Sequence, residues 1–268
     1  MRLTVDHRTT YRFTAPQSRV VQLLRLTPGN AHDQTVASWR IHLDCDARLR
    51  DGRDGFGNQV TMLYAEGPLS TIEIAMHGEV VTSHSAGVVL GMPEPLAPAL
   101  FLRPTPATTA DDALAAWAQE VVGGGTRLAG LHALNAGLHA RFTVERERRG
   151  SVRPAGEAAA GGRATPRELA QLFCAGARAT GTPARFVSGY HLWDVDGEHR
   201  PAPHGWAEAF VDGIGWVGFD PTTGRSPEDT YIRVAVALDA AGAAPVAGSR
   251  LGEGDEELDV DVTVSRDD

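Results

Sequence analysis

Residues 204–224 read HGWAEAFVDGIGWVGFDPTTG, and the fold class rests on the hairpin that this stretch encodes. Two short apolar runs flank the turn-forming residues Asp212–Gly215, which predicts a pair of antiparallel strands. The chain reversal would place His204 and Asp220 at the same end of neighbouring strands. A carboxylate beside an imidazole fixes its tautomer and stabilises its protonated form, as a general base requires. His204 and Asp220 are therefore interpreted either as a general base with its orienting carboxylate or as a hydrogen-bonded structural pair.

A helix is predicted upstream of this hairpin, over about residues 166–180. Thr165–Glu168 (TPRE) has the composition of a capping box, with Thr at the N-cap, Pro at the first helical position and Glu at the third. Apolar residues on one face follow between 169 and 177, and Gly181 with Pro183 ends the helix. A further strand is expected over residues 184–193, before the hairpin begins.

The remainder of the chain divides into three parts by its periodicity. Residues 1–83 alternate apolar and polar positions in short runs, which is typical of an antiparallel β-sandwich. Residues 84–108 contain five prolines and no periodicity, so they are expected to form a linker. Residues 109–268 are expected to form an α+β domain. In that domain Thr109 with Asp112, and then Thr126, start two helices, and strands over 231–236 and 258–264 close the chain.

Composition excludes several classes of function. The chain of 268 residues carries a formal charge of −9, and all of its 25 cationic side chains are arginine. A chain without lysine cannot use a Schiff-base lysine, a phosphate-loop lysine or a lysine general base. Eight acidic residues lie within 253–268, and the rest of the chain is nearly neutral, so no nucleic-acid surface is expected.

The cysteines and the chain start indicate the compartment. Cys45 and Cys174 are too few and too far apart for a disulfide framework or a zinc knuckle. The first residues are charged and form no apolar signal region, and no apolar run is long enough to span a membrane. We therefore expect a cytoplasmic protein without membrane contact.

A histidine-rich segment before the hairpin is the candidate metal site. Its potential ligands are His191, Asp194, Asp196, Glu198, His199 and His204. Their spacing fits no established ligand pattern, and Asp194–Gly197 forms a good hairpin turn without an ion. The expectation is a structural turn with solvated histidines, and neither a metal nor another cofactor.

The hairpin, together with Arg185–Tyr190 (RFVSGY), resembles the bacterial transglutaminase-like proteins, which are relatives of the papain-type thiol fold. Leu24–Pro28, Asp54–Asn58 and Tyr231–Val236 extend the resemblance over nearly the whole chain. It implies a β-rich N-terminal region followed by a transglutaminase-like core. In that core a cysteine at a helix N-terminus, a strand histidine and a strand aspartate form a catalytic triad, and His204 and Asp220 match the last two.

The chain departs from the family pattern at the nucleophile. The family's cysteine lies in a Gly-x-Cys-Gln-Asp run, and counting back without a gap from Gly181–Arg185 (GTPAR) places it at Pro166. Proline supplies neither a thiol nor an N–H for an oxyanion hole. Cys174 lies about 12 Å further along the helix, where the helix dipole no longer lowers the pKa of a thiol. Thr165 is nearer, but its hydroxyl is expected to cap the helix.

These observations favour a transglutaminase-like protein without thiol-dependent activity. Its cleft is expected to be retained as a binding surface for a peptide or a partner protein, with Trp206 and Trp216 near the walls. The alternative is a residual hydrolase of peptide or amide bonds, in which His204 and Asp220 act with water, a metal or another nucleophile. A purely structural role for the His204–Asp220 pair is also left open.

Overall fold

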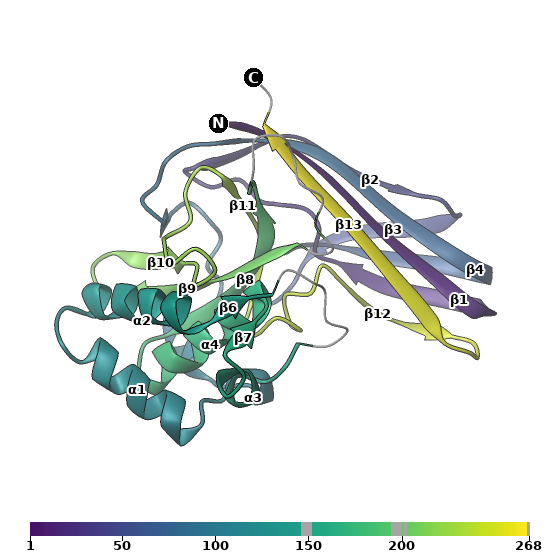
Figure 1. Ribbon diagram of the computed structural model, residues 1–268. Helices are drawn as coiled ribbons and strands as arrows, with labels where there is room; N and C mark the ends of the chain where they lie inside the picture. The colour runs from purple at the N-terminus through teal and green to yellow at the C-terminus, as the bar shows by residue number, and fades with distance from the viewer. Residues whose placement is uncertain (146–151, 194–199, 201–202, 267–268) are drawn as a thin grey trace.

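The computed structural model describes residues 1–145, 152–193, 200 and 203–266, and it shows an α+β fold with mostly antiparallel sheets (Figure 1). The first sheet comprises β1 (Arg2–Leu24), β2 (Gln34–Leu43), β3 (Ala47–Arg53), β4 (Gln59–Thr82), β12 (Val246–Leu251) and β13 (Glu256–Arg266). The second comprises β5 (Val88–Val89), β8 (Ala184–His191), β9 (His204–Val211), β10 (Gly215–Phe219) and β11 (Tyr231–Ala237). The helices are α1 (Asp112–Val122), α2 (Arg127–Arg141), α3 (Ala155–Ala159) and α4 (Pro166–Ala179), with 3₁₀ turns at Pro98–Leu102 and Pro106–Thr108. β6 (Thr143–Val144) and β7 (Arg163–Ala164) form a small parallel pair.

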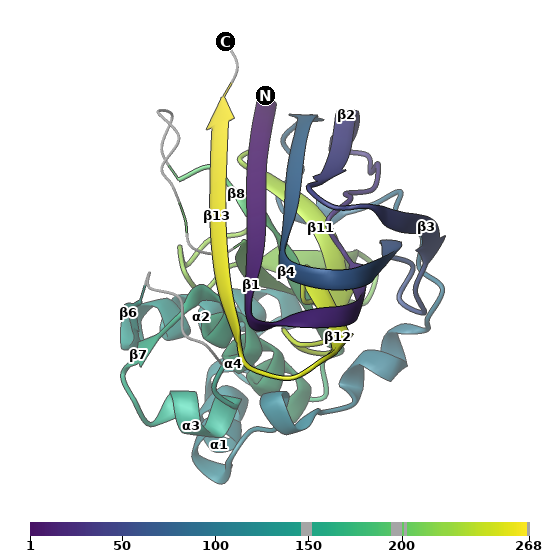
Figure 2. The ribbon, with the colours of Figure 1, turned by 90° about the vertical axis from the view of Figure 1, so that its right-hand side faces the viewer.

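The β-rich N-terminal region is one folded sheet. β1 and β4 pair along nearly their whole lengths, with register shifts between Arg12 and Arg19. Both strands turn sharply at this point, so the sheet has two arms (Figure 2). Apolar residues of both arms, such as Ile72 and Leu63, share one buried cluster. The antiparallel, β-rich character expected for residues 1–83 is confirmed. The predicted β-sandwich of several short strands is instead one bent sheet, because two long strands run through both arms.

The C-terminal strands belong to this first sheet, although they were expected in the second region. β12 and β13 both pair antiparallel with β1, and Leu3 lies opposite Arg266 in the register. In β13, Val262 and Val264 are buried while most of the acidic side chains are exposed. This alternation lets β13 cover the outer edge of β1 with an apolar inner face and a charged outer face.

The second sheet carries the predicted hairpin. β9 and β10 pair antiparallel with Gly215 opposite Val211, and Gly213 and Gly215 have positive φ angles in the turn between them. β10 also pairs with β5, so part of the predicted linker is a strand of this sheet. Figure 1 shows the helices on one side of the second sheet and the long strands of the first sheet on the other.

Helix α4 lies at the centre of the second region. The predicted capping box is confirmed, because Thr165 N donates to Glu168 Oε2 (2.9 Å) and Glu168 N donates to Thr165 Oγ1 (3.3 Å). Gly176 lies against Leu134 of α2 and Ala118 of α1, where a Cβ would meet side chains at 3.3–3.4 Å. The absence of a side chain there lets both helices pack closely on α4. None of the helices in the described ranges is long and apolar enough to cross a bilayer.

The other predicted helix starts differ in detail. α2 is capped by Thr126 as expected, since its side chain accepts from Ala129 N. α1 begins at Asp112, and its cap is Asp111, whose Oδ1 accepts from Leu114 N at 2.8 Å. The prediction of a cap at Thr109 was wrong, because an aspartate two residues later offers an equally strong cap closer to the apolar face.

A buried histidine lies where the two sheets meet. His7 of β1 contacts Tyr190 Oη through Nδ1 (2.9 Å) and Thr9 Oγ1 through Nε2 (3.0 Å). Burial lowers the pKa of His7 to about 4, although the charge of Asp261 opposes the change. The ring is therefore neutral in the folded protein at neutral pH.

We expect His7 to make the fold less stable in acid. Its pKa is about 6.5 when unfolded and about 4 when folded, so the unfolded state binds the proton first as the pH falls. The stabilisation from the neutral, buried His7 ring is fully present above pH 6.5 and is lost between pH 6.5 and 4. By pH 4.5 the free energy of unfolding should have fallen by about 2–3 kcal/mol from this residue alone. Urea unfolding at pH 7.5 and 4.5 should show a smaller difference for His7→Gln than for wild type. The exposed His42→Gln is the control, and equal pH dependence in all three proteins would contradict this assignment.

Candidate functional site

Four side chains meet at one end of the second sheet. The strand order β11-β8-β9-β10 brings together the end of β8, the starts of β9 and β11, and the residue after β10. These positions are His191, His204, Tyr231 and Asp220, which we call the His204 site. The register supports the placement, because His191 lies opposite Tyr231 across β8 and β11.

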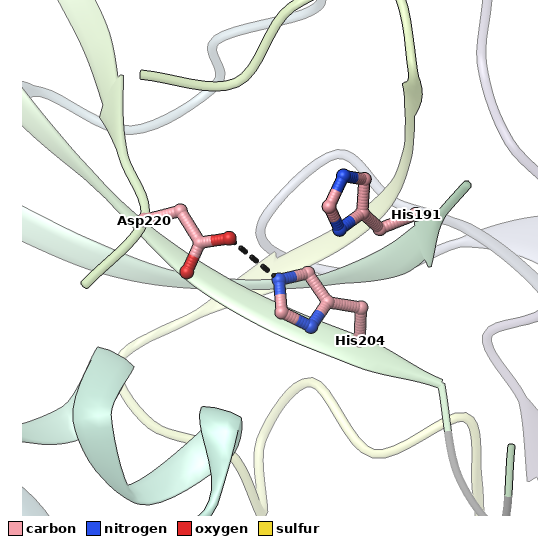
Figure 3. Close-up of side chains that lie close together, drawn as sticks. All are labelled: His191, His204 and Asp220. Atoms are coloured by element: carbon pink, nitrogen blue, oxygen red, sulfur yellow. Dashed lines mark hydrogen bonds and ion pairs between the residues drawn. The ribbon is translucent and has the colours of Figure 1, made fainter. Parts of the chain in front are cut away.

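Asp220 is the centre of the hydrogen bonding in the His204 site. His204 Nε2 lies 2.8 Å from Asp220 Oδ2, as expected from the hairpin (Figure 3). Tyr231 Oη donates to the same oxygen at 2.8 Å, and Thr222 N donates to Oδ1 at 2.8 Å. The other nitrogen of His204 points away from Asp220 (Figure 3). This arrangement holds the imidazole in one orientation and leaves Nδ1 to face a reacting group.

The electrostatics keep Asp220 ionised. Its side chain is fully buried, and burial alone would raise the pKa of this carboxyl group. The charge of His204 and the hydrogen bonds from His204, Tyr231 and Thr222 outweigh burial, so the pKa of Asp220 is lowered overall. Burial, and then the Asp220 charge, raises the pKa of Tyr231, which remains a hydrogen-bond donor.

His191 was predicted as a solvated histidine, but it lies against the His204–Asp220 pair. Its ring stacks on Tyr231 with centroids 3.9 Å apart and planes at 15°. Its Nδ1 is buried and has no hydrogen-bond partner in the described part of the chain. Burial, followed by the charge of His204, lowers the pKa of His191 to about 3. His191 reaches His204 and Tyr231 because β8 lies between β9 and β11, and a single sequence does not reveal this strand order.

The two tryptophans predicted at the walls have different positions. Trp206 stacks near His204, with centroids 6.0 Å apart, and packs edge-on against Tyr231. It is buried beside the His204 and Tyr231 rings. Trp216 lies opposite Phe210 in the register, roughly 20 Å along β9 from His204. The prediction for Trp216 was therefore wrong: it packs on Phe101 and under the Arg185 guanidinium, whose Cζ lies 3.9 Å from the ring centroid.

The first turn of α4 lies beside the start of β9. The Cγ of Arg167 is 3.2 Å from the point that a Cβ on Gly205 would occupy. Pro166 precedes Arg167 and His204 precedes Gly205, so both candidate positions are one residue from this contact. The hydroxyl of Thr165 accepts from Glu168 N, and this bond occupies it in the helix cap.

Neither cysteine lies at the site. Cys174 is fully buried in the middle of α4, and burial raises its pKa to about 11. Cys45 is partly buried in the first sheet, where burial and the charges of Asp44 and Asp46 raise its pKa. A thiol with a raised pKa is a weak nucleophile near neutral pH.

A buried ion network supports β9 behind the site. Glu208 is fully buried, and its two oxygens accept from Arg185 Nε (2.6 Å) and Arg233 Nε (2.7 Å). Arg185 also donates to both oxygens of Glu94, at 2.6 and 2.8 Å. Burial would raise the pKa of Glu208, but the charges of Arg233 and Arg185 lower it to about 2. Sequence reasoning gave Glu208 no role.

The metal-site candidates from the sequence divide between two parts of the chain. Asp194, Asp196, Glu198 and His199 lie outside the described residues, as does the turn predicted at 194–197. His191 and His204 are described, and they lie near Asp220. One donor atom from each of these three residues lies within 4.8 Å of the other two.

Comparisons with families and relatives agree with this architecture. Residues 3–81 match the family model of the bacterial transglutaminase-like N-terminal region, and residues 115–221 match that of the transglutaminase-like superfamily. An uncharacterized protein of Mycobacterium leprae is 26% identical over 99% of this chain and 99% of its own length. An uncharacterized protein of Mycobacterium tuberculosis H37Rv is 26% identical over 92% of this chain and 87% of its own.

A solved structure shares the fold along the whole chain. It is the crystal structure of a cysteine-protease candidate from Cytophaga hutchinsonii, 19% identical, with a TM-score of 0.76. The match covers 100% of this chain and 92% of the other. At this identity the likeness shows a common architecture.

Proposed function

The chain belongs to the transglutaminase-like superfamily, and from this premise we propose that it is a member without a nucleophile, whose cleft binds a peptide or partner protein. The observation that carries the proposal is the first turn of α4. Pro166 begins the helix beside β9, while the His204–Asp220 pair is intact at 2.8 Å. The site has a base and its orienting carboxylate, and at the third position it has neither a thiol nor a backbone N–H.

The described residues near Pro166 do not replace the nucleophile. Cys174 is fully buried with a raised pKa, and it lies two turns further along α4. Thr165 is buried, and its hydroxyl is an acceptor in the capping box. Removal of a nucleophile from a triad of this kind lowers kcat by about 10⁶-fold.

A residual hydrolase is the second candidate. Its support is the ordered His204–Asp220 pair, which could orient a water molecule in the way it would orient a thiol. A cytoplasmic location is part of the first proposal. It is supported by two unpaired cysteines, Cys45 and Cys174.

The absence of a reactive thiol is tested by a vinyl-sulfone probe. We expect no labelling of Cys174 in the folded protein, because it is buried and its pKa is raised to about 11. Labelling should appear once the protein is unfolded in urea, which is the positive control. Mass spectrometry of the labelled peptides gives the readout. Stoichiometric labelling of folded Cys174, with loss of a glutaminyl-peptide turnover in Cys174→Ala, would overturn the proposal.

The binding role is tested in the same protein by affinity capture from the native host. We expect a recovered partner to be lost from His204→Ala and Arg167→Ala, which change the cleft. It should be retained by Arg127→Ala, whose exposed side chain contacts Thr180 at the far end of α4. A partner that binds all three variants equally would show that the cleft is not the binding surface.

A further inference from the structure

Three donor atoms converge at the His204 site from three different strand ends. His204 Nε2 and Asp220 Oδ2 are 2.8 Å apart. A ring nitrogen of His191 lies within 4.8 Å of one donor atom of His204 and of one carboxylate oxygen of Asp220. Ligands that share one zinc ion at bonds of about 2.0–2.2 Å lie roughly 3–4 Å apart. To share one ion, the His191 nitrogen would move closer by up to about 1–2 Å, and the His204–Asp220 pair would open from 2.8 Å to the same spacing.

His191 supplies the observation that points to a ligand. Its Nδ1 is buried and without a hydrogen-bond partner in the described residues. In Figure 3, Nδ1 of His191, the ring nitrogen bonded to Cγ, is directed towards His204 and Asp220. A buried, unsatisfied polar atom destabilises the folded protein, and coordination of a metal would satisfy it.

The surrounding residues orient the donors as an outer shell would. Tyr231 stacks on His191 and donates to Asp220 Oδ2, which has a second lone pair for a metal. Thr222 N holds the other carboxylate oxygen. The charge of Arg200 acts against a cation here, since Arg200 is close enough to affect His191 electrostatically. Its guanidinium lies over the Trp193 ring, with Cζ 5.0 Å from the centroid.

We propose that His191, His204 and Asp220 bind one Zn²⁺ ion. Two imidazole nitrogens and one carboxylate oxygen suit zinc, whereas calcium and magnesium prefer oxygen ligands only. On binding, Zn²⁺ takes the place of the proton between His204 Nε2 and Asp220. The neutral His204 ring then keeps its one proton on Nδ1. A three-ligand site leaves the fourth zinc position for water.

This proposal goes beyond the proposed function and is independent of it. A peptide-binding cleft without a thiol requires no metal, and a zinc site requires no peptide. Failure of zinc binding would leave the peptide-binding proposal intact. Reactivity of Cys174 would likewise leave the zinc site intact.

The test is titration of the metal-stripped chain with Zn²⁺ by calorimetry, followed by elemental analysis after gel filtration. We expect one zinc per chain for wild type. His191→Phe keeps a ring against Tyr231 and removes the nitrogen, and it should weaken binding by roughly 100-fold or more. The matched control is His77→Phe, because His77 also lies beside a carboxylate, that of Asp6, but on the exposed surface, so its loss should leave the zinc affinity unchanged.

Substitution of Co²⁺ gives a second readout. Four-coordinate Co²⁺ should give visible absorption bands without the thiolate charge-transfer band that a site at Cys45 would produce. Circular dichroism and thermal melting without metal show whether His191→Phe folds, and His191→Gln replaces it if it does not. Equal zinc affinity in wild type and the His191 variant would overturn the proposal. Absence of stoichiometric binding would overturn it as well, and would assign the His191 nitrogen to water.

Discussion

Replacement of Pro166 by cysteine in a Cys45→Ser background will create a thiol that iodoacetamide alkylates at pH 6 at least roughly tenfold faster than Cys45 in the wild type. The new thiol would stand at the N-terminus of α4, where the helix dipole favours a thiolate. The first turn of α4 lies against Gly205, next to His204, whose imidazole would accept the thiol proton and form an ion pair with the thiolate. Cys45 is the reference because burial, Asp44 and Asp46 raise its pKa.

The role of His204 in this result can be separated from that of the helix. Adding His204→Ala to the double variant should lower the alkylation rate several-fold, while the dipole contribution remains. The loss of Pro166 itself should cost no more than about 1 kcal/mol, because a proline at the first helical position acts mainly on the unfolded chain. A rate at or below that of Cys45 would show that Pro166 is not the position of the family's nucleophile.

The Glu208→Gln substitution will lower the free energy of unfolding by about 3–5 kcal/mol, because it leaves buried arginine charge without its partner. Arg185 retains Glu94, whereas Arg233 loses its negative partner and keeps at most one hydrogen bond, to the single amide oxygen that replaces the carboxylate. Urea denaturation at pH 7 measures the change. Glu79→Gln is the matched control, since Glu79 pairs with Arg2 at the surface and should contribute less than about 1 kcal/mol.

The same network predicts a dependence on pH. The pKa of Glu208 is about 2 in the folded protein and near 4.5 when unfolded, so its stabilisation is fully present above pH 4.5. It is lost as the pH falls from 4.5 towards 2, where the unfolded chain takes up the proton first. Glu208→Gln should therefore show a shallower loss of stability in this range. An unchanged slope together with a small effect at pH 7 would mean that the network is not a structural unit.

Local features of the fold could be predicted from the sequence. The capping box at Thr165–Glu168 and the hairpin turn at Asp212–Gly215 depend on residues that are neighbours in the chain. The His204–Asp220 contact follows from that hairpin, because both residues lie at its open end. These interactions are short in sequence, so residue type and spacing determine them.

Features that depend on strand order could not be predicted in this way. His191 and Tyr231 join the site because β8 lies between β9 and β11, and no local pattern specifies that order. Trp216 was misplaced for a different reason: it lies next to the turn of the β9–β10 hairpin, whereas His204 lies at the open end. The partners of Glu208 are Arg185 of β8 and Arg233 of β11, and Arg185 also binds Glu94 of the predicted linker. The position of Glu208 in the sequence therefore gave no indication that its charge is buried.

The pairing of β1 with β13 has a consequence for how the chain folds as it is synthesised. The hydroxyl of Thr14 donates to the carbonyl of Asp255, 241 positions away in sequence. The β1–β13 pairing can therefore form only after nearly the whole chain has been translated. Until then β1 can pair with β4 but presents an unsatisfied row of backbone groups on its other side. Contacts of such long sequence separation slow folding, and exposed strand edges promote association between nascent chains. β13 is the last strand to join the sheet, and its acidic side chains are exposed. Their charges should repel the same strand of a second copy of the chain.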